Sequence, residues 1–141
     1  MGTKLVLENQ QGVYKRRAHN VGISMWHLQW CTKYRYKMFK QEHIRTFCEV
    51  AIKEGCTRNK IEIIAMNVQP DHVHIVVVLP RGMSDATALN FVKGFSSFIL
   101  FRLVPNFRKR YPKGCLWAPS SFSATVGYTE LDSVVEYVKN Q

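Results

Sequence analysis

Residues 61–79 read IEIIAMNVQPDHVHIVVVL, in which two runs of mostly β-branched residues stand on either side of Gln69, Pro70 and Asp71. β-Branched residues favour strands, whereas proline and aspartate favour a tight turn. The stretch therefore predicts a β-hairpin with one strand at 61–68 and the next at 73–79.

On the N-terminal side of the hairpin, the chain predicts one strand and one helix. Residues 23–36 alternate in polarity and are rich in aromatic side chains, which predicts a long strand. The basic end of this strand would carry Lys33 and Arg35 on one face. Residues 41–56 place apolar side chains at helical spacing, and Gly55 marks the predicted end of that helix.

On the C-terminal side, a second helix and a further strand are predicted. Ser84 is a good N-cap for a helix that ends before Pro105. Residues 116–126 resemble a strand interrupted by Pro119, which predicts an edge or irregular strand. The expected apolar stripe of the helix consists of Leu89, Val92, Phe95, Ile99 and Leu103.

A last helix is predicted at 130–140, where Thr129 with Asp132 resembles a capping box. The order of elements is then β-α-β-β-α-β-α. This order predicts an α+β fold, a ferredoxin-like antiparallel sheet (β-α-β-β-α-β) with an added C-terminal helix.

The composition is globular and strongly basic. Of 141 residues, 46% are hydrophobic and 21% are charged, and 20 Lys and Arg against 10 Asp and Glu give a net charge of +10. This charge predicts an anionic partner. Aromatic residues lie among the basic ones, a mixture that suits phosphate contacts and base stacking, although aromatics packed in the core below a solvated charged face would give the same pattern.

Domain organisation and compartment follow from the same survey. Residues 1–22 are expected to be an N-terminal extension, with one short strand at 4–7, and residues 23–141 a single domain. The four cysteines form no C-x-x-C pair, which disfavours a zinc ribbon or a disulfide scaffold. Since no apolar run approaches the roughly 20 residues that span a bilayer, a cytoplasmic protein without a membrane partner is expected.

His72 and His74 are the first candidates for chemistry. They stand two residues apart in a predicted strand, so both imidazoles project from the same face and can share one metal ion. Asp71 precedes them and is a candidate partner for an imidazole N–H. When this pattern is taken alone, structural or surface histidines explain it more often than a metal site does.

Tyr137 and Gln141 are the second pair of candidates. Four residues apart on the predicted last helix, they occupy one helical face, so that a tyrosyl oxygen and an amide oxygen can converge on one site. The alternative is that Tyr137 is an aromatic residue packed in the apolar stripe. Tyr128 competes as a nucleophile, but it precedes the helix and has no partner at helical spacing.

Residues 71–77, D-H-V-H-I-V-V, resemble the HUH motif (histidine, hydrophobic residue, histidine) of nucleases that cut single-stranded DNA with a tyrosine. From about residue 24 onward the chain resembles the TnpA-type single-tyrosine transposases of the insertion-sequence two-hundred and six-hundred-five group. Phe122 departs from the pattern, because the family often has a tyrosine there. The resembling blocks lie, in order, at 26–35, 91–97, 116–122, 125–127 and 136–141.

The resemblance implies a metal-dependent endonuclease and strand transferase that cuts and joins insertion-sequence ends. Tyr137 would be the nucleophile that forms a 5′-phosphotyrosine. It further implies a homodimer that binds single-stranded DNA with hairpins at the element ends, with Tyr137 and the histidines in one site supplied by different subunits. Mg²⁺ or Mn²⁺ would be held by His72, His74 and Gln141, with DNA contacts from Lys33, Arg35 and Lys93.

Two other readings are open at the level of sequence. A domesticated relative or a nicking enzyme of replication would use the same chemistry. A non-catalytic ferredoxin-like module that binds single-stranded DNA or RNA would share the charge and the aromatic residues but would be indifferent to metal.

Overall fold

The computed structural model describes Gly12 and residues 23–141, so the strand expected at 4–7 lies outside the described residues. The described part contains four strands in one sheet, with the order β2-β3-β1-β4 and antiparallel pairing throughout. The strands are β1 (Ser24–Thr32), β2 (Glu62–Val68), β3 (His72–Leu79) and β4 (Trp117–Thr125). The helices are α2 (Glu42–Arg58), α3 (Asp85–Leu103), α4 (Phe107–Arg110) and α5 (Leu131–Lys139), with 3₁₀ turns η1 (Lys33–Arg35) and η2 (Tyr128–Glu130). The predicted ferredoxin-like sheet with an added C-terminal helix is confirmed.

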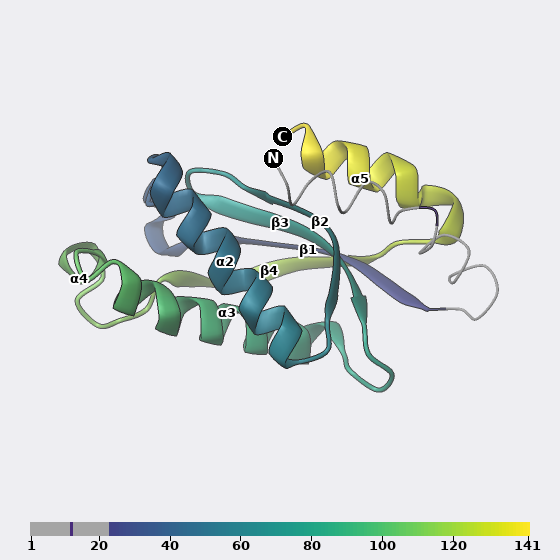
Figure 1. Ribbon diagram of the computed structural model, residues 1–141, viewed down its shortest axis with the longest axis horizontal. Coiled ribbons are helices and arrows are strands. Elements are labelled where there is room, and N and C mark those ends of the chain that lie inside the picture. The colour runs from purple at the N-terminus through teal and green to yellow at the C-terminus, as the bar shows by residue number, and fades with distance from the viewer. Residues whose placement is uncertain (1–11, 13–22) are drawn as a thin grey trace.

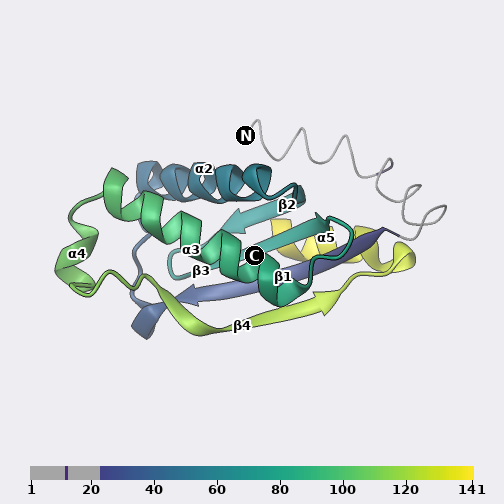
Figure 2. The same cartoon turned by 90° about the horizontal axis from the view of Figure 1, so that it is seen from below.

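The two faces of the sheet are covered by different helices. The α2 and α3 helices lie side by side against one face (Figure 2), and α5 lies against the other (Figure 1). Side chains alternate along β3, so Val73, Ile75 and Val77 join the core under α2 and α3, whereas Val76 and Val78 pack under α5. This alternation also puts His72 and His74 on the α5 face.

Two predicted boundaries were wrong. The β1 strand ends at Thr32, and the chain turns at η1 with Tyr34 at φ 63° and Arg35 at φ 54°, so the basic end is not an extended strand. The α2 helix continues past Gly55 to Arg58. A β-carbon at Gly55 would stand 3.2 Å from Phe95 Cδ2, so this glycine allows α2 to approach α3 closely and does not end the helix.

The α3 helix begins as predicted, because the Ser84 hydroxyl oxygen accepts a hydrogen bond from the Thr87 amide at 3.1 Å. The predicted stripe is displaced, however. Leu103 is 45% exposed, and Ser96 and Leu100 are fully buried in its place. The helix ends at Leu103, shortly before Pro105, as expected.

The end of the chain also follows the prediction with one change. β4 lies at the edge of the sheet, as its proline suggested. The capping box before α5 lies two residues earlier than predicted, at Gly127 and Glu130, where Glu130 Oε1 accepts from the Gly127 amide at 2.9 Å. In the part of the chain that the structure describes, every helix is too short or too polar to cross a bilayer.

Candidate active site

A cluster of aromatic rings occupies the sheet face beside α5. His72 and His74 extend from β3, with ring centroids 4.9 Å apart. His27 of β1 stacks on His74 at 5.5 Å. The Tyr137 ring meets both edge-on, with centroids 5.8 Å from His74 and 6.0 Å from His27. The structure therefore brings the predicted tyrosine and histidines together within one chain.

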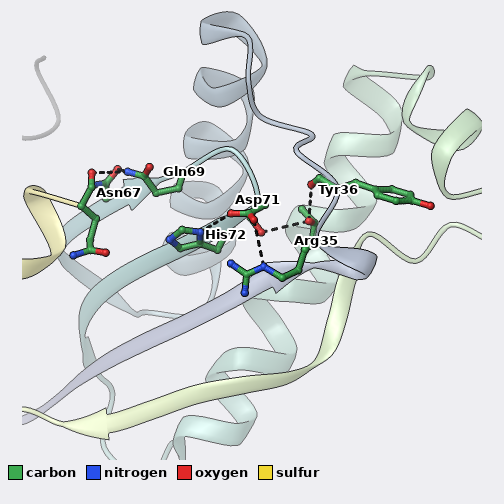
Figure 3. Close-up of polar contacts among 8 residues, drawn as sticks. Arg35, Tyr36, Asn67, Gln69, Asp71 and His72 are labelled. Carbon is green, nitrogen blue, oxygen red and sulfur yellow. Dashed lines mark hydrogen bonds and ion pairs between the residues drawn. The ribbon is translucent and has the colours of Figure 1, made fainter.

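Asp71 orients His72 and also contacts a cation. Asp71 Oδ1 stands 2.7 Å from His72 Nδ1, and Asp71 Oδ2 accepts from Arg35 Nε at 3.3 Å (Figure 3). Burial raises the pKa of Asp71, but the hydrogen bond from His72 and the nearby Arg35 outweigh that effect and leave the pKa below its usual value. Because Nδ1 of His72 faces a carboxylate, it carries the proton, and Nε2 is left as the free electron-pair donor.

His74 is the most buried member of the cluster, at 1% exposure. Burial lowers its pKa to about 4, assisted by His72 and His27, and burial also lowers the pKa of His27. Both rings are therefore neutral at neutral pH. His74 Nδ1 lies 3.3 Å from His27 Nε2, whereas His74 Nε2 is buried without a hydrogen-bond partner among the described residues.

This donor set fits a divalent cation. An unpartnered buried imidazole nitrogen is costly unless something binds it, and Nε2 of His74 is such an atom. His72 presents its own Nε2 on the same face. Within residues 23–141, the described side chains include no group of three or more His, Cys, Asp and Glu that could hold a metal. A metal bound by these two imidazoles would therefore take its remaining ligands from amide, water or substrate oxygens.

Gln141 does not share a helical face with Tyr137, contrary to what its spacing had suggested. The α5 helix ends at Lys139, and Asn140 is its C-cap, so helical spacing no longer relates Gln141 to Tyr137. What fixes Gln141 is its main-chain oxygen, which accepts from Gln69 Nε2 at 2.8 Å. Its side chain is exposed.

The three predicted DNA contacts fall in two places. Lys33 and Arg35 belong to η1, and Arg35 reaches the edge of the ring cluster through Asp71. Lys93 lies on α3, where its Nζ donates to Ala118 O at 2.8 Å and to Ser121 Oγ at 2.9 Å, so it connects α3 to β4. Lys93 therefore lies apart from the histidines.

His27 is the residue of this cluster that the sequence alone did not identify. The signal was present, because residues of β1 alternate and His27 shares a face with Gln29, the partner of His74 in the ladder. Finding it required the register between β1 and β3, which spacing within a single strand does not give.

Comparisons with known proteins point to one family. A family model described as "Transposase IS200 like" matches residues 20–141. The chain is 28% identical over 116 residues to the ISDra2 transposase TnpA of Deinococcus radiodurans, covering 82% of each chain. It is 25% identical over 130 residues to the transposase for insertion sequence element IS200 of Salmonella typhimurium, covering 92% of this chain and 84% of the relative.

Two solved structures resemble the fold. A putative transposase from Deinococcus radiodurans has a TM-score of 0.67 and 26% identity, with 83% of this chain and 89% of that chain covered. A REP-associated tyrosine transposase bound to a REP hairpin has a TM-score of 0.57 and 17% identity, with 82% and 64% covered. The second likeness concerns the fold alone.

Proposed function

Because the chain belongs to the family of IS200-like transposases, we propose that it cuts and rejoins single-stranded DNA through a covalent bond to Tyr137, with help from a divalent metal at His72 and His74. The observation that carries the proposal is the Tyr137 ring against His74, 5.8 Å between centroids. A tyrosine that is 52% exposed yet fixed beside two histidines is accessible to a substrate.

In the first step the Tyr137 oxygen attacks a phosphorus of the DNA backbone. The Tyr137 hydroxyl loses its proton and forms one P–O bond as the P–O3′ bond breaks. The departing 3′-oxygen gains one proton, so the products are a 5′-phosphotyrosine and a free 3′-hydroxyl. A 3′-hydroxyl from a second strand then attacks the phosphotyrosine and releases Tyr137. Since each step exchanges one phosphodiester for another, joining needs no ATP.

His72 and His74 would hold the metal through their Nε2 atoms, with Asp71 and His27 keeping each ring in the required tautomer. Mg²⁺ or Mn²⁺ suits two imidazoles completed by oxygen ligands. The bound cation would neutralise the charge of the phosphate under attack. Gln141 is proposed as the amide ligand, supported by the anchoring of its main chain beside β2.

The DNA partner is proposed to carry hairpins at the ends of an insertion sequence. The net charge of +10 supports a nucleic-acid partner, and Lys33 and Arg35 are proposed contacts near the site. A homodimer is also proposed, and it is supported by the position of β4 at the edge of the described sheet, since an edge strand can pair with a strand of a second chain. A non-catalytic binding module is disfavoured, because such a module needs neither Tyr137 nor the histidine pair.

The test is the capture of labelled oligonucleotides. The protein is incubated with single-stranded DNA from the sequence that flanks its gene, with Mn²⁺, Mg²⁺ or chelator, and resolved on a denaturing protein gel. We expect label on the protein only with metal, no label with Tyr137→Phe, and strong loss with His72→Ala. Tyr128→Phe is the matched control, since Tyr128 is also exposed, at 40%, and should leave labelling unchanged.

Two outcomes would contradict the proposal. Tight binding of the flanking DNA without any adduct in either metal would favour a non-catalytic binding module. An adduct that persists in Tyr137→Phe but disappears in Tyr128→Phe would move the nucleophile to η2.

A further inference from the structure

Asn67 of β2 is a buried amide beside the ring cluster. It is 8% exposed and pairs with His74 across the β2–β3 ladder, so its side chain stands on the same face as the histidines. Its Nδ2 donates to Val138 O at 2.8 Å. A buried side chain of the sheet thus binds a carbonyl at the C-terminal end of α5, one residue after Tyr137.

Gln69 extends this contact. Its Nε2 donates to Asn67 Oδ1 at 3.0 Å (Figure 3) and to Gln141 O at 2.8 Å. The weaker contacts of Asn67 Nδ2 with Lys139 O and Gln141 O, both 3.5 Å, lie in the same region. We call Asn67 and Gln69 the amide clamp. It binds main-chain carbonyls at the end of α5 and just beyond it, where the helix provides no partner for them.

The apolar contacts of α5 do not by themselves fix its orientation on the sheet. Leu131, Val135 and Val138 are buried against the sheet, and burial of this kind attracts a helix but does not fix its rotation or its position along the axis. A helix of nine residues is also too short to be stable alone. The directional hydrogen bonds of the clamp can therefore set where the Tyr137 ring lies.

We propose that Asn67, supported by Gln69, is a positioning residue that holds the C-terminal end of α5 so that Tyr137 stays against His74 and His27. Its catalytic consequence rests on the proposed function of Tyr137. The clamp itself is a statement about the fold and can be tested without DNA.

The first experiment measures the helix directly. In Asn67→Leu, which has a similar volume but no donor, amides of α5 should exchange with deuterium about tenfold faster, the size expected for one lost buried hydrogen bond. Amides of β1 and β3 should keep their protection. With 3-fluorotyrosine incorporated, the Tyr137 ¹⁹F resonance, assigned through Tyr137→Phe, should shift because the ring leaves the neighbouring imidazoles.

The second experiment measures the reaction. The rate of adduct formation by Asn67→Leu should fall about tenfold, whereas its Kd for the same oligonucleotide should not change. Asn59→Leu is the matched control, because Asn59 Nδ2 also donates to a helix carbonyl, Gly55 O at 2.8 Å, but does so at the end of α2. Gln69→Ala should show the same changes in weaker form and decides the test if Asn67→Leu does not fold.

The results separate the alternatives. Unchanged α5 exchange and an unchanged ¹⁹F resonance in both clamp variants would overturn the inference, as would faster exchange spread evenly over the sheet. If wild-type protein forms no adduct, the proposed function fails, and the exchange and ¹⁹F data still decide whether the clamp holds α5.

Discussion

The buried imidazole of His74 should make the protein lose stability as the pH falls. Its folded-state pKa is about 4 against an ordinary 6.5, so the unfolded chain takes up the proton first. Stability therefore decreases as the pH falls from about 6.5 toward 4, and the contribution of neutral His74 is fully present above that window. From these two pKa values, the loss between pH 7 and pH 5 is about 2 kcal/mol.

The assay is urea unfolding at pH 7 and pH 5, in chelator so that no bound metal contributes. The measured quantity is the change in unfolding free energy between the two pH values. In His74→Gln that change should be about 2 kcal/mol smaller than in wild type, whatever the absolute stability of the variant. His43→Gln is the control, since His43 is exposed on α2, and it should behave as wild type. Equal pH dependence in wild type and His74→Gln would refute the reasoning.

Two further predictions concern other contacts. Ser96 is fully buried and its Oγ accepts from Trp117 Nε1 at 3.0 Å, so Ser96→Ala should lower the unfolding free energy by about 1–3 kcal/mol in urea titration; an unchanged midpoint would contradict this. Arg35→Gln should weaken single-stranded DNA binding and reduce the slope of log K against log salt by about 0.7. Arg58→Gln is the control, because Arg58 is as exposed as Arg35 and also pairs with a carboxylate, that of Glu54 on α2. It should change neither the affinity for DNA nor the salt slope.

The fold could be predicted because its signals are local. β-Branched runs, a proline-containing turn and the Ser84 cap each act over a few residues, and the order of elements then leaves few topologies. The errors arose where a residue distant in sequence determines where a helix or strand ends. Gly55 looked like a helix end, but the approach of Phe95 from α3 explains it. The end of β1 depends on the contacts of Lys33 with Leu116 and Tyr111, which are distant in sequence.

In the candidate site, too, relations within one segment could be predicted, whereas relations between segments could not. His72 and His74 are related by spacing in one strand, so their common face followed from the sequence. His27 joins them only through the register of β1 against β3. The α5 helix ends at Lys139, two residues before Gln141. Neither fact follows from the pattern of a single segment.

The turn η1 explains how its basic residues, Lys33 and Arg35, are connected to the histidines. Tyr34 and Arg35 both have left-handed backbone angles, which cost on the order of 1 kcal/mol or more for residues other than glycine. The flanking chain is firmly held: Lys33 N donates to Leu116 O at 2.8 Å, and the Tyr111 hydroxyl donates to Lys33 O at 2.7 Å.

Such a strained turn persists only when its surroundings impose it. Its result is that Arg35 reaches back to Asp71, the carboxylate that orients His72. The remaining guanidinium N–H groups of Arg35, which is 61% exposed in its side chain, are available to a phosphate. Arg35 is thus an exposed basic side chain that also contacts the carboxylate orienting His72, so one residue lies between the basic turn and the histidine pair.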